Sequence, residues 1–222
     1  MLKPAQQAFK PLILPPGVRY SELFRQLYVS LDLPLDPELV VIGITSAISG
    51  EGRTTVALGL AQTLMADLDL PVTLVEADLE RPSLALHFDI AASPGLCEVL
   101  RGEMTLVEVM RSVSDNLSIV TTGTSGADSA RLLTQLPLTD PFHKTSGLRG
   151  LVVVDLPPII NSSYSAYAAE ATDAVVLVVR AGVTPTGVVR EAISRLGDHA
   201  PRGVVLNGQR SALPGWWPGS RA

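Results

Sequence analysis

The chain has 222 residues, of which 46% are hydrophobic, and a formal net charge of −5. This size and composition suit one α/β domain with a large buried sheet, whereas the acidic balance argues against nucleic acid as a partner. A single cysteine excludes a disulfide framework, no apolar run approaches the ~20 residues of a membrane helix, and prolines interrupt the start of the chain in a way unlike a signal peptide. The sequence therefore predicts a cytoplasmic protein.

The first predicted elements lead up to a glycine-bearing loop. Residues 1–19 are rich in proline and are expected to form an extended arm. Residues 20–31 place apolar side chains at helical spacing, and residues 40–44 form a continuous apolar run typical of a parallel strand buried on both faces. Residues 56–68 again show helical spacing. The order is strand, loop and helix, which is the context that a phosphate-binding loop requires.

The loop itself reads Thr-Ser-Ala-Ile-Ser-Gly-Glu-Gly-Arg-Thr-Thr over residues 45–55. Gly50 and Gly52 let the backbone wrap an anion closely, and the helix N-terminus that follows favours negative charge. The Thr54 hydroxyl is suited to a Mg²⁺ shell. However, Arg53 stands where the standard pattern has lysine, and Ala47 where it has glycine. A strand–turn–helix without any ligand therefore stays open as the alternative.

Acidic residues follow two of the predicted strands. Residues 72–75 end in a charged cluster, Glu76, Asp78, Glu80 and Arg81, and residues 151–154 end in Asp155. In open α/β sheets, ligands bind at the carboxyl ends of the strands, and an acid at such an end holds Mg²⁺ in phosphate-loop enzymes. The alternative is a charged, solvated loop.

The remaining elements alternate between helix and strand. Strands are predicted over residues 117–120, 174–179 and 203–206, and helices over 96–100, 106–110, 129–136 (ended by Pro137), 165–171 and 187–196. This alternation predicts a doubly wound, mostly parallel α/β sheet with helices on both faces, spanning residues 20–207, in which 40–44 and 151–154 are neighbouring central strands. Tyr164 and Tyr167 are expected to be packing residues. Residues 208–222 form a tail that contains Trp216 and Trp217.

These motifs together resemble the bacterial tyrosine kinases of capsule and exopolysaccharide synthesis, a family related to the Min and Par ATPases. Residues 45–54 are similar to the family's TSxxPGEGK[ST] loop, residues 74–83 to its IDADLRRPS motif, and residues 153–158 to its IIDTPP motif. Residues 178–184 and 203–207 also fit, so the resemblance covers most of the chain. It implies a phosphate-loop (P-loop) NTPase fold.

The resemblance also implies a site for ATP and Mg²⁺ and assigns residues to it. The phosphates would be held by Ser49, Gly50, Glu51, Gly52, Arg53, Thr54 and Thr55, and the adenine would contact Asn207. Mg²⁺ would be held by Thr54, Asp78 and Asp155. The catalytic group would be Arg53, Glu76, Asp78 and Asp155, with Asp78 activating the attacking tyrosine hydroxyl.

The resemblance further implies two kinds of partner. One is a membrane-embedded polysaccharide co-polymerase that activates the kinase and recruits it to the inner face of the cell membrane. The other is a second copy of the chain, because Glu22 and Arg25 match the start of the family's ExxRxxR oligomerisation helix. Tyr28 replaces the second arginine of that motif and should weaken the contact.

Several departures from the family bear on activity. Lysine is replaced by Arg53, an aspartate by Glu76 and an arginine by Glu80, and the family's C-terminal tyrosine cluster is absent. Lysine acts as a compact point charge, whereas guanidinium is planar and larger, so positioning should suffer more than binding. An ATP-binding protein with impaired phosphotransfer is therefore expected. The alternatives are an active kinase without its own tyrosine tail and a non-catalytic scaffold.

Overall fold

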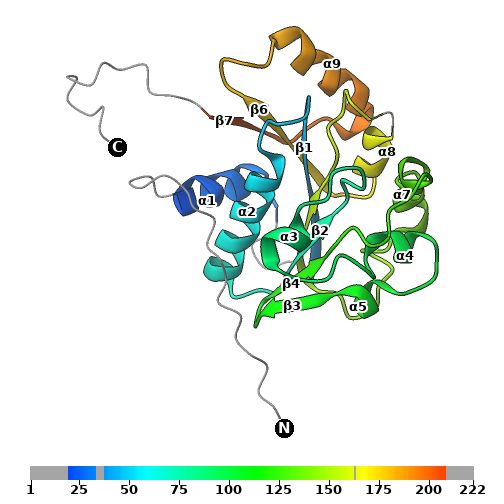
Figure 1. Ribbon diagram of the computed structural model, residues 1–222. Helices are drawn as coiled ribbons and strands as arrows, with labels where there is room; N and C mark the ends of the chain where they lie inside the picture. Colours follow the sequence, from blue (N-terminus) through cyan, green and yellow to red (C-terminus); the bar gives the residue numbers. More distant parts are fainter. Residues whose placement is uncertain (1–19, 34–37, 163, 209–222) are drawn as a thin grey trace.

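The computed structural model describes residues 20–33, 38–162 and 164–208 (Figure 1). The predicted arm of residues 1–19 and the tail beyond Gly208, with Trp216 and Trp217, lie outside the described residues.

The described residues form one seven-stranded sheet with the order β3-β4-β2-β5-β1-β6-β7. Its strands are β1 (Leu39–Ser46), β2 (Val72–Glu76), β3 (Arg111–Ser114), β4 (Leu117–Val120), β5 (Gly150–Asp155), β6 (Ala174–Arg180) and β7 (Gly203–Asn207). Neighbouring strands are parallel except for β3 and β4. The predicted pairing of the strands around residues 40–44 and 151–154 is confirmed, because β1 and β5 are hydrogen-bonded neighbours at the centre of the sheet.

Helices cover both faces of the sheet, as the sequence predicts (Figure 1). One face packs against α1 (Tyr20–Ser30), α2 (Arg53–Leu68) and α3 (Leu84–Phe88). The other face packs against α4 (Leu96–Leu100), α5 (Leu106–Val109), α6 (Ser129–Leu132), α7 (Gln135–Thr139), α8 (Ser165–Ala169) and α9 (Thr186–Leu196), the last of which continues into the 3₁₀ turn η1 (Gly197–His199). None of the described helices is long and apolar enough to span a membrane.

The central strands explain the hydrophobic composition. Every residue of β2 and β5 is buried, and so is all of β1 except Leu39, because these strands have helices on both sides. On the first face, α1 and α2 approach closely at Gly59, where an added Cβ would lie only 2.2 Å from the Phe24 ring. Glycine at this position lets α1 lie against α2.

Four short elements, β3, α3, α6 and α7, differ from the sequence prediction. β3 and α3 were not predicted. The predicted helix over residues 129–136 is instead the pair α6 and α7, and Pro137 lies inside α7 rather than ending the helix before it. Proline is tolerated there because it occupies the first turn, where backbone N–H groups have no intrahelical acceptor.

Candidate nucleotide-binding site

The predicted site residues meet at one edge of the sheet. β2, β5, β1, β6 and β7 run parallel, so their carboxyl ends lie together. The register pairs Asp155 with Ile44 on one side and with Glu76 on the other. The end of β1 therefore delivers the loop directly beside Asp155, which is the arrangement that the sequence predicts.

The loop between β1 and α2 presents its backbone amides. Gly50 and Gly52 have φ values of 83° and 92°, a conformation that favours glycine. At Gly52 a Cβ would also lie 2.1 Å from the Asn207 amide nitrogen, so a larger residue would have to displace the Asn207 side chain. Among the described residues, no hydrogen-bond acceptor is found for the backbone N–H groups of residues 50–55. Free amides at the start of the long helix α2 are what an anion needs.

Thr54 and Asp155 form the part of the site suited to a metal ion. The Thr54 hydroxyl donates to Asp155 Oδ2 at 2.5 Å, and Asp155 is only 1% exposed. Its other oxygen, Oδ1, is buried and has no hydrogen-bond partner in the described part of the chain. Burial raises the pKa of Asp155 to about 6, although the charge of Arg53 opposes the shift. A buried carboxylate oxygen without a partner, beside a hydroxyl, fits Mg²⁺.

The described residues contain no cluster of three or more acidic, histidine or cysteine side chains that would bind a metal by themselves. Mg²⁺ in nucleotide sites is usually bound through one or two carboxylates together with phosphate oxygens and water.

The Arg53 side chain is not free to contact a phosphate on the loop. Its guanidinium forms a buried ion pair with Asp78, with 2.7 Å between Nη2 and Oδ2, and it also donates to the Leu156 carbonyl. The side chains of Arg53 and Asp78 are 9% and 6% exposed. The structure therefore brings together two residues predicted to be catalytic, but it neutralises the one cation that the loop supplies.

Glu76 is held by protein donors rather than directed toward the loop. Oε1 accepts the Ser83 amide and the Leu84 amide, the latter at 2.7 Å, at the start of α3. Oε2 accepts the Thr122 hydroxyl at 2.9 Å. Both oxygens therefore connect the end of β2 to α3 and to the segment after β4, and the place of Glu76 in the catalytic group stays a prediction.

Other predicted residues brace the loop. Glu51 is buried and accepts hydrogen bonds from the Ile48 amide at 2.8 Å, the Arg180 amide at 3.0 Å and the Thr184 hydroxyl. Asn207 donates from Nδ2 to the Glu51 carbonyl at 2.8 Å. The Glu51 side chain thus fixes the shape of the loop, whereas Asn207 lies at the Gly52 side of it.

Ser49 is contacted by two residues to which sequence reasoning gave no role in the site. Its amide donates to Asn161 Oδ1 at 3.1 Å, and its hydroxyl accepts from the Arg81 guanidinium. Arg81 was visible in the sequence as a charge after β2. Asn161 gave no signal, since only the fold carries the segment after Pro157 and Pro158 back to the loop.

Two residues of the predicted oligomerisation helix α1 already make contacts within the protein. Arg25 already binds Asp67 of α2, with 2.5 Å between Nε and Oδ2, and Glu22 at 2.6 Å. Tyr28, at the position of the family's second arginine, is not a surface residue, because it is 2% exposed and belongs to the core. The helix therefore contributes first to the protein's own packing.

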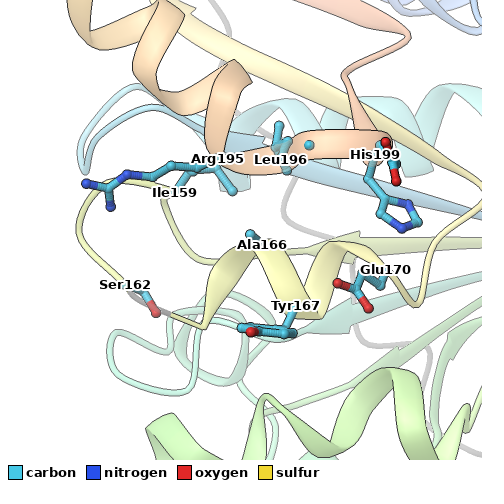
Figure 2. A pocket seen from close by; sticks show the side chains of 10 residues that line it. Ile159, Ser162, Ala166, Tyr167, Glu170, Arg195, Leu196 and His199 are labelled. Atoms are coloured by element: carbon cyan, nitrogen blue, oxygen red, sulfur yellow. The ribbon is translucent and has the colours of Figure 1, made fainter.

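A separate hollow of about 590 Å³ lies between α8 and the end of α9 (Figure 2). Figure 2 shows Glu170 and His199 at one end of it and Ser162 with Arg195 at the other. Tyr167, on its rim, is 54% exposed, so the expectation that it packs in the interior is wrong, whereas Tyr164 does pack against the core. No residue of the loop lines this hollow, so it is not part of the nucleotide site.

Comparison with known proteins agrees with this geometry. The chain is 25% identical over 194 residues to the tyrosine-protein kinase YwqD of Bacillus subtilis, a match covering 86% of this chain and 81% of that protein. The kinase domain of the Escherichia coli tyrosine kinase ETK has a TM-score of 0.74 at 25% identity, covering 89% of this chain and 79% of that domain. Over most of its length the chain is therefore similar to bacterial tyrosine kinases.

Its fold is that of the P-loop NTPases. The septum site-determining protein MinD of Pyrococcus horikoshii, solved with Mg-ADP, has a TM-score of 0.63 and covers 76% of this chain and 70% of MinD, at 19% identity. No protein-family model matches the chain. The chain spans only about a quarter of several longer curated relatives, namely 25% of a putative tyrosine-protein kinase EpsB of Ralstonia solanacearum and 26% of etk of E. coli.

Proposed function

We propose that the protein binds ATP with Mg²⁺ at the loop of residues 49–55 and serves exopolysaccharide or capsule production as a cytoplasmic tyrosine-kinase-type subunit with slow phosphotransfer. The observation that carries this proposal is the pairing of the loop amides with Thr54 and Asp155, whose buried Oδ1 has no hydrogen-bond partner among the residues that the structure describes. The process is supported by the similarity to the succinoglycan biosynthesis transport protein ExoP of Rhizobium meliloti, which is 27% identical over 212 residues, and the nucleotide by the Mg-ADP complex of MinD.

In this proposal different residues contact the phosphates, the metal ion and the nucleoside. The amides of residues 50–55 bind phosphate, Thr54 and Asp155 hold Mg²⁺, and Asn207 marks the nucleoside end of the loop. Bound Mg²⁺ would supply charge neutralisation on the phosphates. Asp78 would accept the proton of an attacking hydroxyl, but it must first be released from Arg53, which is why transfer is expected to be slow.

A hollow of about 360 Å³ beside Thr54 and Thr55 offers a place for the acceptor group. It is lined also by Leu58, Ser83, Leu86 and His87. We infer that a tyrosine of another protein, or of a second copy, approaches through it.

Binding and transfer are tested separately. Titration with Mg²⁺·ATP, followed by the melting temperature, should stabilise the protein, and Thr54→Ala should weaken the effect. A protein that does not respond to nucleotide would support the alternative of a non-catalytic scaffold. Transfer of ³²P from ATP to a tyrosine-containing peptide then separates a slow kinase from a fully active one.

The partners are likewise proposals. We infer that a membrane polysaccharide co-polymerase recruits the protein, and that the surface of α1 around Glu22 and Arg25 takes part in self-association. Light scattering with and without Mg²⁺·ATP tests the second point. A strictly monomeric protein in both conditions and with the partner present would count against it.

A further inference from the structure

The loop lacks a positively charged side chain that is free to contact a bound phosphate. Phosphoryl groups on a P-loop need a cation that can follow charge as it develops, and Arg53 occupies the sequence position of that cation. Its guanidinium is buried against Asp78 and the Leu156 carbonyl, so both its charge and its donors are already used. Another cation at the loop would supply what Arg53 does not.

Arg81 has the position and the freedom that Arg53 lacks. A turn fixes its backbone, in which the Arg81 amide contacts Asp78 Oδ1 at 3.2 Å and the Asp78 carbonyl at 3.3 Å. The side chain is exposed and crosses to the loop, where Nη1 donates to the Ser49 hydroxyl. No carboxylate of the described residues lies within ion-pair distance of it. Its charge is therefore available to an anionic ligand.

The position of Arg81 relative to the loop indicates which part of a nucleotide it would contact. Asn207 lies against Gly52 and Glu51, whereas Arg81 lies on the side of β2 and Asp78, at the other end of the loop. A metal ion in such sites would contact the β- and γ-phosphates. Asp155, which would hold it together with Thr54 of α2, ends β5, and β5 is the neighbour of β2. The terminal phosphate thus falls on the side of Arg81.

We propose that Arg81 binds the terminal phosphate of a bound nucleoside triphosphate and makes the site prefer the triphosphate over the diphosphate. On binding, the guanidinium would exchange the Ser49 hydroxyl for phosphate oxygens, which match its planar fork. This inference rests on the proposed nucleotide function and deepens it. The positive charge that distinguishes triphosphate from diphosphate would then come from the motif after β2 rather than from the loop.

The experiment compares Mg²⁺·ATP and Mg²⁺·ADP affinities by titration calorimetry on the full chain. Arg81→Gln should weaken ATP binding by about tenfold or more, the size expected for a lost charge-assisted contact, and ADP binding by less than about threefold. Arg81→Lys keeps the charge and should recover most of the ATP affinity. Arg195→Gln, an exposed arginine paired with Glu191 on α9, is the matched control and should leave the ATP-to-ADP ratio unchanged.

Two further variants make the test decisive. Ser49→Ala removes the contact of Arg81 with the loop without removing the charge, and it should change ATP and ADP affinity together. If Ser49→Ala reproduces the selective loss of ATP, Arg81 acts through the loop and the inference is overturned. Arg180, whose guanidinium lies 3.4 Å from the Gly50 carbonyl, is the rival cation. A selective loss of ATP binding in Arg180→Gln instead of Arg81→Gln would also overturn it.

Failure of the inference can be told from failure of the proposed function. If the wild type binds both nucleotides and Arg81→Gln lowers both affinities equally, only the role of Arg81 is wrong. If the wild type binds neither nucleotide, both proposals fall.

Discussion

Arg53 is held in a rigid fork between two acceptors on different segments. A lysine at this position could pair with Asp78 but could not at the same time donate to the Leu156 carbonyl with the same planar geometry. We predict that Arg53→Lys raises single-turnover hydrolysis or phosphotransfer by at least about tenfold, or roughly 1.4 kcal/mol of barrier. The ammonium would no longer be fixed between two acceptors, so it could leave Asp78 for a phosphate oxygen when nucleotide binds. Nucleotide affinity should change by less.

The control for this prediction is the same substitution in another arginine–aspartate pair. Arg101 binds Asp128 at 3.0 Å, away from the loop, so Arg101→Lys should leave hydrolysis unchanged. A wild-type protein that already turns over as fast as Arg53→Lys would support the active-kinase alternative.

Asp155 makes stability depend on pH. Its pKa in the folded protein is about 6, above the ordinary value near 3.9, so between these values the folded state holds a proton that the unfolded chain has released. The free energy of unfolding should therefore fall as pH rises from about 4 to about 6, by on the order of 3 kcal/mol, and then level off. Without Mg²⁺ or nucleotide, Asp155→Asn should remove this loss and be more stable than wild type at pH 8.

Urea unfolding at pH 4.5, 6 and 8 measures this difference. Thr54 can still donate to the amide oxygen of the asparagine, so the variant keeps that contact. Parallel stability profiles for wild type and Asp155→Asn would show that Asp155 does not titrate as stated.

At the scale of elements, Glu76 joins β2 to α3 and β4. Aspartate is one methylene shorter and would leave the amides at the start of α3 or the Thr122 hydroxyl without an acceptor. We predict that Glu76→Asp lowers the free energy of unfolding by about 1–3 kcal/mol and does not raise hydrolysis, although aspartate is the family's residue. Glu103→Asp, at an exposed glutamate, is the control and should be neutral. Faster hydrolysis in Glu76→Asp would support the predicted place of this position in the catalytic group.

The contact between α1 and α2 depends on the absence of a side chain at Gly59. We predict that Gly59→Ala destabilises the protein by about 1–3 kcal/mol despite the better helix propensity of alanine, since its Cβ meets Phe24. Phe24→Leu should partly compensate, which a double-mutant cycle would show as a favourable coupling. Gly187→Ala in α9, where a Cβ meets nothing within 4 Å, should cost no stability. Equal stability of Gly59→Ala and wild type would contradict the packing argument.

The elements that the sequence predicted well are those whose pattern is set by burial along many residues. β1, β5, β6 and α2 show long apolar runs or helical spacing, and they appear close to their expected bounds. The elements that it missed are four or five residues long and depend on contacts distant in the chain. α3 begins where Glu76 accepts its first amides, and β3 exists through pairing with β4.

For the whole molecule, the alternation of elements was enough to predict a doubly wound sheet and to bring the ends of β1, β2 and β5 together. It could not predict how side chains at that edge pair with each other. The ion pair of Arg53 with Asp78 and the crossing of Arg81 to Ser49 join residues 25 and 32 positions apart, at distances that no spacing rule fixes. The sequence therefore identified the residues at the site, but it could not show which of their side chains are free to bind a ligand.

Glu51 also has a consequence for motion. One carboxylate receives hydrogen bonds both from within the loop and from the segment that leads from β6 into α9. The two segments should therefore stiffen together, and amide hydrogen exchange across residues 180–186 should slow when Mg²⁺·ATP is added, although those amides lie outside the phosphate cradle. Glu51→Gln, which replaces one accepting oxygen with a donor, should uncouple the two rates. Nucleotide binding would then change the rigidity of the segment that leads into α9, where another protein could respond to it.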